Sequence, residues 1–311
     1  MIFVDIIILI FGLSLLLYSA DKVVFYADKI AKYHNLSPLL IGLTIVAFGT
    51  SAPELIITIF AALNTPPSTD AIIGNVIGSN IANILLILGC GGLFFKLDFQ
   101  NLNKKDTIYL SIISAYFASI FYFGEITNLV SVGFFILIIF YIRYILNYKK
   151  LETNVSPDSS FSKLIYLLLL FAFLGLFFGG KLFLSKSLAL FFALGVPEAV
   201  IGVTVLAIGT SLPELVTVFI SYIKKNVDIG IGNIIGSNIM NILFVFFPGI
   251  LITQIRGFKF NLSEIPINMI IVFSLATLFI IIIILSNIKL NRLIAILFLL
   301  FYISCGVWVF I

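Results

Sequence analysis

The sequence predicts an all-α integral membrane protein, with ten transmembrane helices arranged as two inverted five-helix repeats. Of its 311 residues, 61% are hydrophobic and only 10% are charged, and the mean hydropathy is +1.23. These values are far from those of an average soluble protein. Many apolar runs reach about 20 residues, enough to cross a hydrocarbon core of about 30 Å as a helix. Long motifs also recur in the same order in both halves of the chain, which indicates a duplicated unit.

Each half is expected to contain five spans, so the second half enters the membrane from the opposite side and the repeats are inverted. Mixed segments after the first and sixth spans leave open how far those two helices continue. The first repeat occupies residues 1–148, a short cytoplasmic linker 149–161, and the second repeat 162–311. The expected spans are 2–20, 37–63, 70–95, 107–123, 126–147, 162–180, 197–223, 229–253, 265–286 and 290–311.

Positive charge is unevenly distributed between the two sides of this arrangement. Fourteen of the eighteen Lys and Arg residues fall on the side that holds the linker, and only Lys181, Lys186, Arg256 and Lys259 fall on the other. The positive-inside rule therefore places the linker in the cytoplasm and both termini outside, in a multi-pass protein of the cell (inner or plasma) membrane. No basic stripe stands clear of the bilayer, which argues against a nucleic-acid partner.

The strongest repeat carries one carboxylate in each copy. GLTIVAFGTSAPEL at 42–55 and GVTVLAIGTSLPEL at 202–215 agree at nine of fourteen positions, and they contain Glu54 and Glu214. The other acids lie in loops or near span ends, and no Lys or Arg lies deep in a span. Because an ionised group is costly inside a membrane, a bound cation is the natural partner. The alternative is that both acids are protonated packing residues.

Hydroxyl groups accompany each acid on one helix face, at positions i, i+3, i+4 and i+7. Pro53 and Pro213 clash with the carbonyls of Gly49 and Gly209, so each helix is expected to break or kink there and to free carbonyl oxygens. The two faces comprise Ala47, Thr50, Ser51 and Glu54, and Ala207, Thr210, Ser211 and Glu214.

A second repeated motif adds amides to the site. GNVIGSNIANIL at 74–85 and GNIIGSNIMNIL at 232–243 agree at ten of twelve positions. The Gly pairs 74/78 and 232/236 have small-xxx-small spacing, which helix packing explains as well as function does. The polar faces are Asn75, Ser79 and Asn83, and Asn233, Ser237 and Asn241.

These residues supply carboxylate, hydroxyl, amide and carbonyl oxygens, without thiolate or imidazole. Such a set favours Ca²⁺, Mg²⁺ or Na⁺ over zinc or copper, and six to eight flexible oxygens suit Ca²⁺ best. The pattern of an intramembrane protease is absent from the sequence, and an enzymatic role or a prosthetic group is not expected. An ion channel remains an alternative to a carrier.

The motifs GTSAPE with GNVIGSNIAN, and GTSLPE with GNIIGSNIMN, resemble the paired repeats of the Ca²⁺/cation antiporter superfamily, in its prokaryotic sodium/calcium exchanger branch. The resemblance implies that Ca²⁺ is exchanged for Na⁺ by a first and a sixth helix that slide past a bundle of eight. It assigns the ion ligands to Ala47, Thr50, Ser51, Glu54, Ser79, Asn83, Ala207, Thr210, Ser211, Glu214, Ser237 and Asn241.

Two features bear on the counter-ion. Exchangers of this branch often carry Asp where Asn241 stands, which leaves ion stoichiometry and potassium dependence open. A Ca²⁺/H⁺ antiporter that uses the same glutamates is the alternative within the superfamily. The only histidine, His34, is expected in a polar loop.

Overall fold

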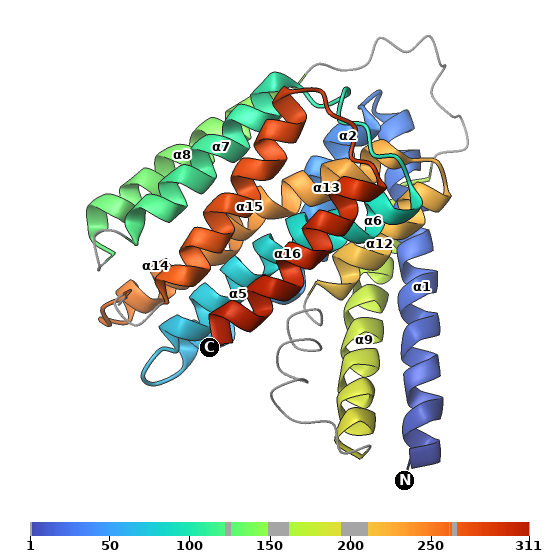
Figure 1. The fold of residues 1–311 in the computed structure, drawn as a ribbon, viewed down its shortest axis with the longest axis horizontal. Coiled ribbons are helices and arrows are strands. Elements are labelled where there is room, and N and C mark those ends of the chain that lie inside the picture. Colours follow the sequence, from blue (N-terminus) through green and yellow to red (C-terminus); the bar gives the residue numbers. More distant parts are fainter. Residues whose placement is uncertain are drawn as a thin grey trace. The chain divides into compact units, whose positions relative to one another are not determined.

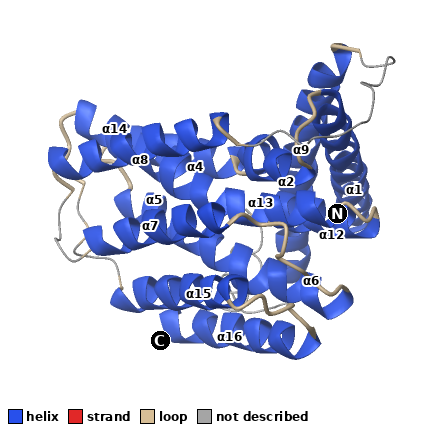
Figure 2. Ribbon diagram, turned by 90° about the horizontal axis from the view of Figure 1, so that it is seen from above, coloured by secondary structure: helices blue, strands red, loops and turns tan. Residues whose placement is uncertain are grey.

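The computed structural model describes residues 2–121, 126–148, 162–193, 211–260, 262 and 266–310. Within these ranges the regular structure is helical and no strand is formed (Figure 2). Six helices are long and apolar enough to cross a membrane, and a seventh crossing is counted if the interrupted pair Pro38–Thr50 and Ala52–Leu63 is one span. An all-helical membrane fold is therefore confirmed, and the count of ten spans stays a prediction.

Contacts divide the chain into two compact units that do not follow the sequence repeats. One consists of Met1–Thr50 with Lys149–Ile234, and the other of Ser51–Tyr148 with Ile235–Ile311. Each unit therefore takes part of its chain from both halves of the sequence. Helix α13 (Val227–Met240) contributes its first turns to one unit and its last turns to the other.

The first unit is built around two long helices that lie side by side, α1 and α9 (Figure 1). Both continue well beyond the spans expected at 2–20 and 162–180, and each is a single uninterrupted helix. The helices of this unit besides the start of α13 are α1 (Ile2–Tyr33), α2 (Pro38–Ile41), the π-helix η1 (Gly42–Val46), α3 (Ala47–Thr50), α9 (Leu164–Ala193) and α12 (Leu212–Ile223).

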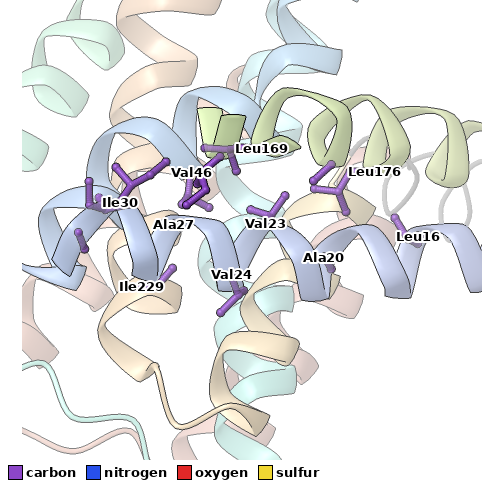
Figure 3. Packing of buried hydrophobic residues seen from close by; sticks show 14 of the residues in the cluster. Leu16, Ala20, Val23, Val24, Ala27, Ile30, Val46, Leu169, Leu176 and Ile229 are labelled. Atoms are coloured by element: carbon purple, nitrogen blue, oxygen red, sulfur yellow. The ribbon is translucent and has the colours of Figure 1, made fainter. Parts of the chain in front are cut away.

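Small residues let α1 and α9 approach closely. A Cβ atom added at Gly179 would lie 2.7 Å from the Leu16 nitrogen, and one added at Gly12 would lie 2.8 Å from the Phe183 nitrogen. Buried apolar side chains along α1, including Leu16, Ala20, Val23 and Ala27, join those of α9 in one core (Figure 3). Lipid tails are as apolar as the side chains, so in a membrane close packing of this kind, and not the hydrophobic effect, drives helix association.

Two ion pairs and one hydrogen bond also link the helices of the first unit. Asp5 pairs with Lys186 at 2.7 Å, and Asp21 of α1 pairs with Lys224, just beyond α12, at 2.6 Å. The exposed His34 follows α1 directly, and its Nε2 hydrogen-bonds to the Tyr166 hydroxyl at the start of α9.

The second unit packs shorter helices around buried phenylalanines. Phe117, Phe134 and Phe246 are fully buried, and the Phe117 and Phe246 ring centroids lie 4.9 Å apart, edge to face. Helix α16 packs against α6, and α15 packs against α7. The helices besides the end of α13 are α4 (Ala52–Leu63), α5 (Thr69–Ile81), η2 (Ala82–Ile87), α6 (Leu88–Phe94), α7 (Lys104–Ile120), α8 (Asn128–Leu146), η4 (Asn241–Phe246), α14 (Phe247–Ile255), α15 (Ile267–Leu285) and α16 (Arg292–Phe310).

Candidate functional site

The expected ligand residues fall in both units. The first unit holds Ala47, Thr50, Ser211 and Glu214. Ala207 and Thr210 lie outside the described residues. The second unit holds Ser51, Glu54, Ser79, Asn83, Ser237 and Asn241.

Glu54 stands in the first turn of α4. The helix is interrupted at Ser51, which occupies the N-cap position, and Pro53 follows within the first turn. A proline is tolerated there because the first N–H groups of a helix have no intrahelical partner. The sequence therefore predicted the interruption, which falls at Ser51 and not at Gly49. The positive end of the helix dipole favours a carboxylate at this place.

Glu214 occupies the same place at the start of α12. Ser211 is the N-cap residue, and Pro213 again lies in the first turn. The Leu215 N–H donates to the Ser211 carbonyl at 2.9 Å, as the Leu55 N–H does to Ser51 at 3.1 Å. The repeated sequence thus gives the same local structure around both acids.

The Glu54 side chain is 0% exposed. The Ser79 hydroxyl of α5 donates to its Oε1 across 3.4 Å, whereas Oε2 has no hydrogen-bond partner among the described residues. None of the described Lys or Arg side chains forms an ion pair with it. A buried carboxylate without a counter-charge carries a large desolvation cost, and a bound cation would offset that cost.

Two neighbours hold α4 in place. The Asn75 amide donates to the Glu54 carbonyl at 2.9 Å and to the Thr58 hydroxyl at 3.1 Å. At the other end, Arg256 donates to the carbonyls of Ala62 and Asn64 at 2.6 and 2.7 Å. A guanidinium at the C-terminal end of a helix also complements its dipole. The helix that carries Glu54 is therefore anchored at both ends.

In the first unit, Glu214 is 1% exposed, and α12 packs against α3. The hydroxyl of Thr50, on α3, donates to Asn233 Oδ1 at 3.0 Å and lies 3.3 Å from the Ala47 carbonyl oxygen. Hydroxyl, amide and carbonyl oxygens are therefore in contact here.

Asn83 and Asn241 lie in π-helical segments. Asn83 is in η2 and Asn241 begins η4, at the same place in the two halves. Both residues are buried, and neither the Oδ1 nor the Nδ2 atom of either has a hydrogen-bond partner among the described residues. Single π-turns are rare and concentrate at functional sites. Buried amides that the protein leaves unsatisfied are suited to contact an ion or water.

The packing of the second unit gathers several of these residues. Helices α4 and α5, which carry Glu54 and Ser79, both pack against η4, the segment of Asn241. Ser79 and Ser237 are buried. One unit thus combines a carboxylate, hydroxyls and amides from both halves of the sequence.

The second motif also contains glycines whose roles differ between the copies. A Cβ at Gly232 would lie 2.9 Å from the Leu43 nitrogen, so this glycine allows close packing against η1. No described atom lies within 4 Å of a Cβ at Gly74 or Gly78. Close helix packing therefore accounts for Gly232 but not, within the described residues, for the other two.

Some buried polar residues were not expected from the sequence. Asn80 and Asn238 are buried at equivalent positions of the second motif. Because both copies carry Asn there, the repeat itself could have predicted that these residues matter. Thr58 and Thr217 are also buried, but they have no counterpart at the equivalent position in the other half. No group of three or more His, Cys, Asp or Glu residues gathers among the described residues.

Known proteins of one family resemble this chain along most of its length. The family model described as "Sodium/calcium exchanger protein" matches residues 4–147 and 164–311. Inner membrane protein YrbG of Escherichia coli (strain K12) is 33% identical, with 79% of each chain covered. Sodium/calcium exchanger MaX1 of Methanosarcina acetivorans is 32% identical and covers 79% of this chain and 82% of its own.

A solved structure extends the likeness to the fold. The sodium-calcium exchanger NCX_Mj, soaked with 10 mM Na⁺ and zero Ca²⁺, superposes with a TM-score of 0.80 over 98% of both chains at 28% identity. The chain therefore belongs to the sodium/calcium exchanger family, in the prokaryotic branch of the Ca²⁺/cation antiporter superfamily, and is a multi-pass membrane transporter.

Proposed function

We propose that the protein exchanges Ca²⁺ for Na⁺ across the cell membrane by alternating access, with the cations bound near the membrane midplane. Family membership supports cation exchange, and the oxygen-only residue set supports Ca²⁺ and Na⁺ as the cations. The proposed ligands are Ala47, Thr50, Ser51, Glu54, Ser79, Asn83, Ala207, Thr210, Ser211, Glu214, Ser237 and Asn241.

The buried carboxylate of Glu54 is the observation that carries this proposal. It lies within reach of the Ser79 hydroxyl and has a second oxygen that no described residue satisfies. An ionised group in such surroundings requires a compensating charge. A Ca²⁺ ion would provide that charge, and Na⁺ would compete for the same oxygens when Ca²⁺ leaves.

The same observation supports one other candidate, a Ca²⁺/H⁺ antiporter, because a proton on Glu54 would also remove the uncompensated charge. The two candidates differ only in the ion that drives Ca²⁺ movement. They can therefore be distinguished by the gradient that drives uptake.

The test uses full-length protein reconstituted in liposomes that are loaded with Na⁺ and diluted into Na⁺-free medium containing radioactive Ca²⁺. We expect saturable Ca²⁺ uptake that requires internal Na⁺ and is insensitive to replacement of external K⁺. An outward proton gradient without Na⁺ should give no uptake above that of protein-free liposomes. Uptake driven by protons alone, with no response to Na⁺, would establish the proton antiporter instead. Flux that needs no counter-ion would indicate a channel.

A further inference from the structure

Three ammonium groups surround one exposed aromatic ring on α1. The Nζ atoms of Lys29, Lys22 and Lys224 lie 4.8, 5.7 and 5.7 Å from the centroid of the Phe25 ring. Lys22 Nζ also lies 5.1 Å from the ring centroid of Tyr18. Phe25 is 41% exposed and Tyr18 is 62% exposed. The cluster of Lys22, Phe25, Lys29 and Lys224 therefore lies at the surface of the first unit.

The cluster lies on a helix face that is apolar further toward the N-terminus. Val4, Phe11, Tyr18 and Phe25 recur every seven residues, so they share one face of α1, and all four are exposed. At 1.5 Å per residue, about 32 Å of helix separates Val4 from Phe25. That length is close to the hydrocarbon thickness of about 30 Å. Along this face, Val4 and Phe11 are followed by Tyr18, a residue type enriched at membrane interfaces. The lysines around Phe25 come next, at the depth expected for lipid headgroups.

The carboxylates nearby neutralise only part of this positive charge. Asp21 is paired with Lys224 at 2.6 Å, and Asp28 is paired with Lys32 at 2.6 Å. Among the described residues, Lys22 and Lys29 form no ion pair. Two ammonium groups therefore remain beside the Phe25 ring without an acidic partner in the described part of the chain.

We propose that Lys22 and Lys29, gathered with Lys224 around Phe25, bind the phosphate of an anionic phospholipid. Lysine binds phosphate as a compact point charge with several donors. The exposed side chains of Leu17 and Tyr18, about 10 Å along α1 from Phe25 and so within one leaflet, would lie along the acyl chains of the same lipid, which favours a lipid over a free phosphate ion. The positive-inside prediction puts this end of α1 in the cytoplasmic leaflet, where anionic lipids create a negative surface potential.

Native mass spectrometry of the full-length protein in detergent tests the proposal, with phosphatidylglycerol as the probe and phosphatidylcholine as the neutral comparison. Lys22→Gln with Lys29→Gln should weaken phosphatidylglycerol binding about 25-fold, since a basic residue near an anionic surface contributes about fivefold. The matched control is Lys104→Gln with Lys105→Gln, two exposed lysines at the start of α7, which removes the same charge and should leave binding unchanged. Unchanged affinity in the first variant, or an equal loss in the control, would overturn the site.

Two further measurements on the unmutated protein do not depend on the folding of a variant. A photoactivatable phosphatidylglycerol should crosslink to the segment 18–29 or to Lys224, and crosslinks confined to other helices would refute the assignment. Inorganic phosphate at the same concentration should not displace the lipid. Displacement by phosphate would identify a free anion as the occupant and would overturn the lipid proposal.

Discussion

Two acidic side chains of the second unit illustrate how surroundings decide the role of a carboxylate. Asp98 lies in the loop after α6, partly exposed, and accepts a hydrogen bond from Lys289 at 2.6 Å. That hydrogen bond holds the pKa of Asp98 below its ordinary value. Glu54 is buried without a cationic neighbour among the described residues. Asp98 therefore needs no further partner, whereas an ionised Glu54 would require one.

Replacing either buried glutamate by glutamine removes the charge while it keeps the shape. We expect Glu54→Gln and Glu214→Gln each to lose about 3 kcal/mol of cation binding, roughly a hundredfold in affinity. Ca²⁺ uptake by liposomes, at equal amounts of folded protein, measures the effect. The control Asp98→Asn removes a carboxylate outside the proposed site and should transport normally. Normal uptake by either glutamine variant would show that the acid is not a cation ligand.

The Asn75 side chain links α5 to α4, because it donates to both the Glu54 carbonyl and the Thr58 hydroxyl. Asn75→Ala and Thr58→Val should each lower the free energy of unfolding by about 1 kcal/mol. The double variant should cost less than the sum of the two, by about 0.5–1 kcal/mol, since both remove one shared hydrogen bond. Thermal unfolding in detergent measures all three. Strict additivity would mean that the hydrogen bond contributes nothing to stability.

The pairing of α1 with α9 is the main structural feature at the scale of helices. Their backbones approach so closely at Gly12 and Gly179 that no side chain fits between them. Gly180, the next residue, differs because a Cβ there would meet its nearest atom, a side-chain carbon of Pro213, at 3.8 Å. These adjacent glycines thus have the same helical backbone but different surroundings.

Alanine substitutions at the two positions should have opposite effects. Gly179→Ala forces a Cβ to within 2.7 Å of the Leu16 backbone and should destabilise the protein by about 1–3 kcal/mol. Gly180→Ala finds room, and it should be neutral or stabilising by up to about 1 kcal/mol because alanine favours the helix. The midpoint of thermal unfolding compares them directly. Equal midpoints would show that α1 and α9 are not closely packed in the membrane.

At the scale of the whole molecule, the distribution of lysine and arginine determines the expected orientation. The linker at 149–161 is predicted to be cytoplasmic, and the loop after α14 is predicted to lie outside together with both termini. Family membership shows a multi-pass membrane protein, and the orientation stays a prediction.

Cysteine labelling can test that orientation in intact cells. In a Cys90→Ser, Cys305→Ser background, Ser263→Cys should react with a membrane-impermeant maleimide, and Ser159→Cys should react only after permeabilisation. The charge bias of the loops is the physical reason for the difference. The reverse pattern would place the termini in the cytoplasm.

Much of the fold was predictable because strong physical constraints act locally. Apolar length identified helices, proline chemistry indicated an interruption beside Glu54, and the absence of other acids deep in the expected spans singled out Glu54 and Glu214. The burial of a third acid, Asp106 in the first turn of α7, was not expected. The π-helical segments could not be predicted, because η2 and η4 have the composition of ordinary apolar helix. The bonds from Asn75 to Glu54 and Thr58 depend on how α4 meets α5, which the sequence pattern does not specify. The continuation of α1 and α9 depends on their mutual packing.

The π-helical turns have a consequence for the tolerance of the chain to insertion and deletion. A π-turn carries one residue more than the α-helical turn that it replaces. Deleting one residue from Ala82–Ile87 would restore α-helical hydrogen bonding there, but it would rotate α6 by about 100°. Gly89 and Gly92 would then turn away from Leu299 and Leu290 of the α16 region, which they now meet closely. Both halves of the chain contain the additional residue at the same place. These segments therefore preserve the rotational position of the helix that follows, and not regular α-helical hydrogen bonding.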